Sequence, residues 1–203
     1  MTWKAIASVI MVATVLGLAA CGGDPPASLT GVVRTPFPVV GSAALPDVAD
    51  GGKPFAFTAP SGEVLVVYFG YTSCPDICPT TMSHLKLALE GLGPKRERVD
   101  VAMVTIDPER DTDLVLTKYV RSFVPDAHPL RTTTDRDLRA AAAAFGADYV
   151  VTKDAAGVEE VGHTAYLYAV DDQGRLRVSW PFGVTAADIE HDLSYLISHD
   201  ATD

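Results

Sequence analysis

Two cysteines separated by three residues, Cys74 and Cys78, carry the clearest chemical signal in the sequence. A proline follows each of them and restricts the backbone of the cysteine before it. A cysteine beside a helix N-terminus faces unpaired N–H groups and the positive end of the helix dipole, both of which favour the thiolate. The thiolate is the nucleophile of disulfide exchange and a soft ligand for metals such as Cu(I) and zinc. The pair therefore predicts a redox or metal site, with a structural disulfide as the alternative.

The residues around this pair predict a strand, a constrained loop and a helix. Residues 64–69 form an apolar run rich in β-branched side chains, as in a strand buried on both faces. Residues 80–92 carry apolar side chains at helical spacing, and Pro79 suits the first helical position, which leaves both cysteines in the loop. A second strand at 99–106 and a second helix at 113–123 follow. This order predicts an α/β fold with helices on both faces of a sheet and a ligand site beyond the carboxyl ends of its strands.

The rest of the chain predicts further elements around this centre. Residues 55–58 alternate and precede a turn, so we expect a hairpin into the cysteine strand. The later elements are a connection at 128–130, a helix at 135–145 ended by Gly146, a strand at 149–151, a polar mobile loop at 153–162, strands at 164–170 and 176–180, and a helix at 185–197.

The segment FGYTSCPDICPTTM, from Phe69 to Met82, resembles the signature of the Sco/SenC family, copper proteins that assist assembly of cytochrome c oxidase. The resemblance implies a thioredoxin-like fold, with a central mixed sheet flanked by helices. It also implies that both cysteines and one distant histidine bind copper. DPERDT at 107–112 resembles a second family block, although a turn in which Asp111 caps a helix is the simpler reading of it.

Five histidines compete for the third ligand position, namely His84, His128, His163, His191 and His199. VGHTAYLYAV resembles the family block whose histidine binds copper, and this points to His163. Family members often have an acidic residue directly before it, whereas this chain has Gly162, so a supporting carboxylate would come from Asp107, Glu159 or Glu160. Met82 could offer a thioether ligand, but a core methionine is the simpler interpretation.

The resemblance implies a copper chaperone that delivers copper to the copper centre of cytochrome c oxidase. Cys74, Cys78 and His163 would form a trigonal site suited to Cu(I), able to take Cu(II) with a further ligand. Delivery requires no catalysis. The main alternative is a thiol-disulfide reductase that keeps the cysteines of the oxidase subunit reduced, and a zinc module is another. The expected partners are the copper-centre subunit of the oxidase, other copper donors and thiol reductants.

The N-terminal residues predict export and a lipid anchor. Lys4 precedes an apolar stretch, and Leu18-Ala19-Ala20-Cys21 resembles a lipobox, which is cleaved before the cysteine that receives lipid. We therefore expect a lipoprotein signal peptide at 1–20, lipidated Cys21 and a flexible tether at 21–52 with an edge strand in part, and the folded domain at 53–203. The protein would lie on the outer face of the bacterial cytoplasmic membrane. A simple anchor helix is the alternative.

The length and the net charge bear on the number of domains and on nucleic-acid binding. The 203 residues are 48% hydrophobic and 21% charged, which suits one globular domain. A formal net charge of -10 argues against nucleic-acid binding, because neutralising phosphates requires clustered lysine and arginine.

Overall fold

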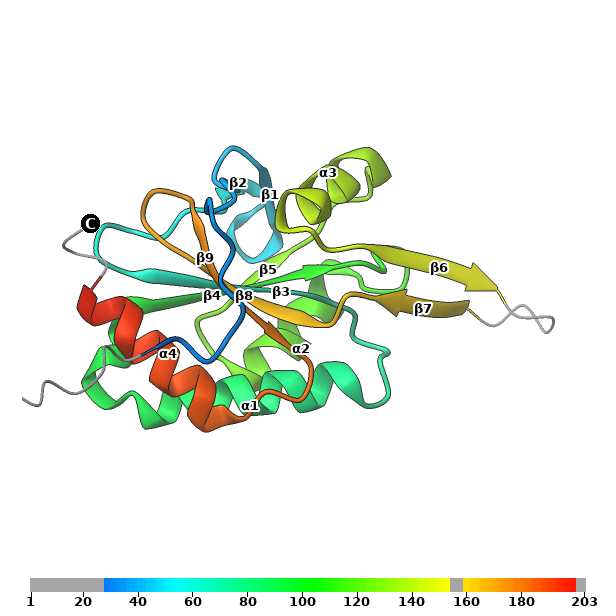
Figure 1. Ribbon diagram of the computed structural model, residues 1–203. Coiled ribbons are helices and arrows are strands. Elements are labelled where there is room, and N and C mark those ends of the chain that lie inside the picture. The colour runs from blue at the N-terminus through cyan, green and yellow to red at the C-terminus, as the bar shows by residue number, and fades with distance from the viewer. Residues whose placement is uncertain (1–27, 154–158, 200–203) are drawn as a thin grey trace, which may run out of the picture.

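The computed structural model describes residues 28–153 and 159–199, which form a mixed sheet with helices on both faces (Figure 1). The sheet has seven strands in the order β2-β1-β5-β4-β3-β8-β9, and β6 and β7 form a separate two-stranded ribbon. The strands are β1 Ala44–Asp47, β2 Lys53–Ala56, β3 Val64–Gly70, β4 Val99–Thr105, β5 His128–Leu130, β6 Tyr149–Lys153, β7 Glu159–His163, β8 Tyr166–Val170 and β9 Leu176–Pro181. The predicted α/β class with a central mixed sheet is confirmed.

Four α-helices cover the sheet. They are α1 Ile77–Gly91, α2 Asp113–Phe123, α3 Asp135–Phe145 and α4 Ala186–His199, with short 3-10 helices at Val48–Asp50 and Gly93–Arg98. Helices α1 and α4 lie side by side on one face, and α3 lies on the opposite face, while the β6–β7 ribbon projects from the body (Figure 1).

Strand β3 is central and buried on both faces, as its apolar run predicts. It pairs in parallel with β4 and antiparallel with β8. Side chains alternate across a strand, so neighbouring residues contact different helices. The Phe69 ring packs edge-on against Phe145 of α3, whereas Tyr68 lies on the face where α1 carries Cys78. The strand thus holds the start of the cysteine loop between two layers of core.

Helices α2 and α3 have the predicted bounds, and each has a clear cap at one end. Thr112 caps α2 by accepting a hydrogen bond from the Val115 N–H, and Gly146 ends α3 in the left-handed conformation with φ of 69°. Three expectations about the strands and loops were wrong. Residues 128–130 form β5 instead of a connection, β2 pairs with β1 instead of the cysteine strand, and part of the expected 153–162 loop is β7.

The folded part begins before Lys53, which corrects the expected boundary. Strand β1 lies inside the sheet, and the preceding segment follows the edge strand β9, where Val32 pairs with Ser179. Asp192 of α4, fully buried, holds this segment by accepting hydrogen bonds from the Thr30 and Gly31 N–H groups and from Trp180 Nε1. The predicted signal peptide and Cys21 lie outside the described residues. Among the described helices, none is long and apolar enough to cross a membrane.

Candidate metal centre

The cysteines lie where β3 ends and α1 begins. Helix α1 starts at Ile77, so Cys78 lies in its first turn, and the expectation that both cysteines precede the helix was wrong for Cys78. A proline in the first turn removes an N–H that has no partner within the helix, so Pro79 is tolerated there. Cys74 stays in the loop, and its Sγ accepts a hydrogen bond of 3.3 Å from the backbone N–H of Cys78. Both cysteines are free thiols.

Cys78 and His163 lie 85 positions apart in the sequence and are in contact in the fold. The Sγ of Cys78 lies 3.8 Å from Nε2 of His163, which β7 carries at the base of the projecting ribbon. Cys78 is fully buried, and the Cys74 side chain beside it is 9% exposed. The structure therefore brings His163 to Cys78 and places Cys74 next to Cys78. Their role as ligands remains a prediction.

The distance from Cys78 Sγ to His163 Nε2 fits a weak hydrogen bond between a thiol and an imidazole, and it also fits two ligands of one ion. With bond lengths of about 2.3 Å to sulfur and about 2.0 Å to nitrogen, two ligands of a trigonal ion lie about 3.7 Å apart. Within the described part of the chain, however, no three His, Cys, Asp or Glu side chains are grouped as a metal site. The spacing of Cys78 and His163 therefore fits the prediction, whereas a three-ligand site would require the Cys74 sulfur to come closer to these two.

The two thiols differ in acidity. Burial raises the pKa of Cys74, but hydrogen bonds from the backbone N–H groups of Cys78 and Asp76 outweigh it, so the pKa lies below the ordinary value of 9.0. Burial raises the pKa of Cys78 to about 12. Cys74 is therefore the thiol that loses its proton first, and Cys78 is deprotonated only when a cation or another sulfur takes the place of the proton.

His163 lies in an aromatic and partly buried setting. The rings of Tyr68 and Tyr71 lie edge-on to the imidazole, with centroids 6.2 and 6.0 Å away. Burial lowers the pKa of His163, which favours the neutral imidazole that binds metals. Its Nδ1 is buried and has no hydrogen-bond partner among the described residues. Asp107, expected to support the ring, instead pairs with Arg110, and the side chains of Glu159 and Glu160 are not described.

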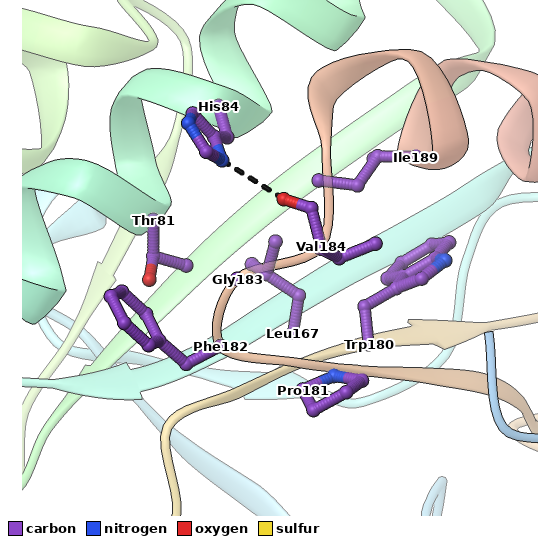
Figure 2. A pocket seen from close by; sticks show the side chains of 9 residues that line it. All are labelled: Thr81, His84, Leu167, Trp180, Pro181, Phe182, Gly183, Val184 and Ile189. Carbon is purple, nitrogen blue, oxygen red and sulfur yellow. Dashed lines mark hydrogen bonds between the residues drawn. The ribbon is translucent and has the colours of Figure 1, made fainter.

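The other histidines lie elsewhere. Figure 2 shows His84 of α1 directed to the carbonyl of Val184, beside a small pocket whose lining includes neither cysteine, and its Nδ1 lies 2.9 Å from that carbonyl oxygen. His191 and His199 are exposed on α4. Met82 is fully buried, in agreement with a core role.

His128 contacts side chains of neighbouring strands of the sheet and is not part of the cysteine site. Its Nδ1 lies 2.6 Å from Asp47 and its Nε2 3.5 Å from Asp100. The hydrogen bond to Asp100, reinforced by Asp47, raises the pKa of His128 to about 9 against the opposing effect of burial. A charged imidazole therefore joins β1 and β5 to β4 at neutral pH.

Sequence reasoning missed one residue near the cysteines, Asp111. It was expected to cap a helix, but Thr112 is the cap of α2, and the Asp111 carboxylate instead accepts hydrogen bonds from Thr72 and Thr105. Two sequence signals could have indicated this position. DPERDT resembles a family block, and Asp111 follows β4 closely, where loops at the ends of neighbouring parallel strands meet.

The sequence model described as SCO1/SenC matches residues 47–198, which is most of the chain. The chain belongs to the SCO1/SenC family. An SCO2-like protein of Rickettsia prowazekii is 27% identical over 157 residues, which cover 68% of this chain and 73% of that protein. The mitochondrial SCO1 homolog of Homo sapiens is 30% identical over 61% of this chain, and the match spans 45% of the human protein. The resemblance of the cysteine segment to this family is thereby confirmed.

Solved SCO1/SenC structures share the fold. The solution structure of apo Sco1 from Thermus thermophilus is 32% identical with a TM-score of 0.67, covering 86% of this chain and 96% of that one. The structure of Bradyrhizobium japonicum ScoI, described as having copper bound, is 26% identical with a TM-score of 0.64, covering 81% of this chain and 99% of that one. These likenesses agree with the thioredoxin-like fold that the family implies.

Proposed function

We propose that this SCO1/SenC protein binds copper through Cys74, Cys78 and His163 and delivers it to the copper centre of cytochrome c oxidase during assembly. The observation that carries the proposal is the 3.8 Å separation of Cys78 Sγ and His163 Nε2, with Cys74 Sγ on the backbone N–H of Cys78. Two thiolates and a neutral imidazole form a soft donor set suited to Cu(I). Copper here is cargo, so the site must release it as well as hold it.

The family comparisons support this choice of metal and partner. Bradyrhizobium ScoI is described with copper bound, and the Sco family is described as cytochrome c oxidase assembly proteins. Zinc suits the same three donors, so a zinc module stays the alternative metal site. For the location, we propose a lipid anchor at Cys21 on the outer face of the bacterial cytoplasmic membrane. A SCO1/SenC member from Bacillus anthracis is described as a lipoprotein.

Deletion of the gene tests the proposed delivery. Cytochrome c oxidase activity should fall in the deletion strain and recover when copper is added to the medium, because excess copper bypasses a chaperone. Recovery with a membrane-impermeable thiol reductant but not with copper would favour the reductase instead. Unchanged oxidase activity in the deletion strain would contradict both.

The different acidity of the two thiols favours disulfide exchange as a second candidate function. The Cys74 thiolate would attack a substrate disulfide and release one substrate sulfur as a thiolate. Cys78 would then lose its proton and attack Cys74, releasing the second substrate sulfur and leaving a Cys74–Cys78 disulfide. An external thiol reductant must return the pair to two thiols. Substitution of His163 separates the two functions, because exchange needs only the sulfurs.

A further inference from the structure

Asp111 is a fully buried carboxylate between two loops. Its Oδ2 accepts hydrogen bonds from the Thr72 N–H, at 3.0 Å, and from the Thr105 hydroxyl, at 2.6 Å. Its Oδ1 accepts the Thr72 hydroxyl at 2.5 Å. Thr105 ends β4, and Thr72 lies in the cysteine loop two residues before Cys74. One side chain therefore joins the loop after β3 to the end of β4.

A buried carboxylate is costly unless hydrogen bonds compensate for lost water. Capping does not account for Asp111, because Thr112 caps α2. Its three partners instead lie on the two segments that flank the cysteine site. Hydrogen bonds to a charged acceptor are stronger than those between neutral groups, so the contact can hold a loop in one conformation.

The contact of Asp111 with Thr72 continues the pairing of β3 with β4 beyond the end of the sheet. Gly70 is the last residue of β3, and its carbonyl accepts the Ile106 N–H at 3.0 Å. Asp111 fixes Thr72 just beyond this bond, and the Cys74 N–H then bonds the Tyr71 carbonyl at 3.4 Å. Hydrogen bonds thus hold the backbone from the end of β3 to Cys74 at successive residues. At Thr72 the partner is the side chain of Asp111, which lies in the neighbouring loop.

We infer that Asp111 is a positioning residue that holds Cys74 beside Cys78, so that the two sulfurs act together on an ion or with each other. The copper part of this inference rests on the proposed function. Asp111 touches neither copper nor substrate, and its effect passes through the backbone of the cysteine loop. Residues that orient metal ligands typically change metal affinity by about 10- to 100-fold when they are substituted.

The test compares Asp111→Ala and Thr105→Val with a matched control, Thr112→Ala, which removes the neighbouring helix cap without touching the loop. Thr105→Val keeps the side-chain shape and removes the hydrogen bond to Asp111 together with the one that the hydroxyl accepts from the Asp107 N–H, so it serves where Asp111→Ala fails to fold. Each variant is measured as the full-length protein at a temperature at which circular dichroism shows it to be folded. The two readouts are Cu(I) affinity by chelator competition and the equilibrium of the Cys74–Cys78 disulfide with glutathione.

We expect Asp111→Ala and Thr105→Val to weaken Cu(I) binding about tenfold or more. Their disulfide should also be reduced about tenfold more readily, a change of about 30 mV, because the sulfurs are less often together. Thr112→Ala should lower stability and change neither readout. Parent-like values of both readouts in the two folded variants would overturn the inference and leave Asp111 a stabilising residue. If the parent binds no copper, the proposed function fails, and the disulfide equilibrium alone decides the role of Asp111.

Discussion

Alkylation should distinguish Cys74 from Cys78 in the reduced protein, because their pKa values differ. Burial raises the pKa of Cys78 to about 12, and hydrogen bonds from backbone N–H groups hold that of Cys74 below 9.0, so the two pKa values differ by at least about three. At pH 7, each increase of the thiol pKa by one lowers the fraction of thiolate tenfold. A thiolate of higher pKa is also a better nucleophile, with a Brønsted coefficient of about 0.4–0.5, and this offsets part of the loss in rate. The net rate ratio is about 30-fold or more in favour of Cys74, and the complete burial of Cys78 increases it.

The assay is timed labelling with iodoacetamide at pH 7, followed by mass spectrometry of the peptides. Cys78→Ser should label as fast as the parent, and Cys74→Ser should label about 30-fold more slowly or not at all. Denatured protein is the control, in which both cysteines should react alike. Equal rates in the folded protein would refute the reasoning that helix N–H groups and burial separate the two thiols.

Three further predictions concern stability and location. His128 contributes stability below pH 6.5 that is lost as pH rises through about 9, because its pKa is raised in the folded protein. The His128→Gln variant should lack this pH dependence in urea unfolding, about 1–2 kcal/mol after solvent screening, and an equal slope in both proteins would contradict it. Asp192→Ala should lower the free energy of unfolding by about 2–4 kcal/mol, since Trp180 Nε1 and the Thr30 and Gly31 N–H groups lose their acceptor, and a melting temperature like the parent's would count against this. Cys21→Ala should move the protein out of the membrane fraction with its fold intact, and continued retention would indicate an anchor helix.

The elements nearest the cysteines could be predicted because their sequence signals agree. The apolar run of β3 indicates a strand covered on both faces, and α2 and α3 each have a clear cap at one end, Thr112 before α2 and Gly146 after α3. By contrast, β5 has three residues and β7 reads EEVGH, too short or too polar for a strand pattern. The strand β1 contains Pro46 and pairs mainly with the edge strand β2, so it gave only a weak signal.

Only those parts of the candidate site that depend on local sequence could be predicted from the residues themselves. The spacing of Cys74 and Cys78 and the start of a helix nearby are local features, and the sequence shows them directly. The approach of His163 to Cys78 depends on how a ribbon folds back across 85 residues, and only the family resemblance pointed to it. The contacts of Asp111 could not be read from the sequence, because its partners Thr72 and Thr105 come together only when β3 and β4 align.

The measurement that tests the central claim most directly is Cu(I) affinity for the parent, His163→Ala and His191→Ala, by competition with a chromophoric chelator at equal thiol content. His163 supplies the imidazole at 3.8 Å from Cys78 Sγ, whereas His191 is exposed on α4. Loss of one ligand worth a few kcal/mol should raise the dissociation constant on the order of 10²-fold in His163→Ala and leave His191→Ala like the parent. Disulfide formation by Cys74 and Cys78 should persist in all three proteins. Equal Cu(I) affinities for all three would remove His163 from the site and contradict the account.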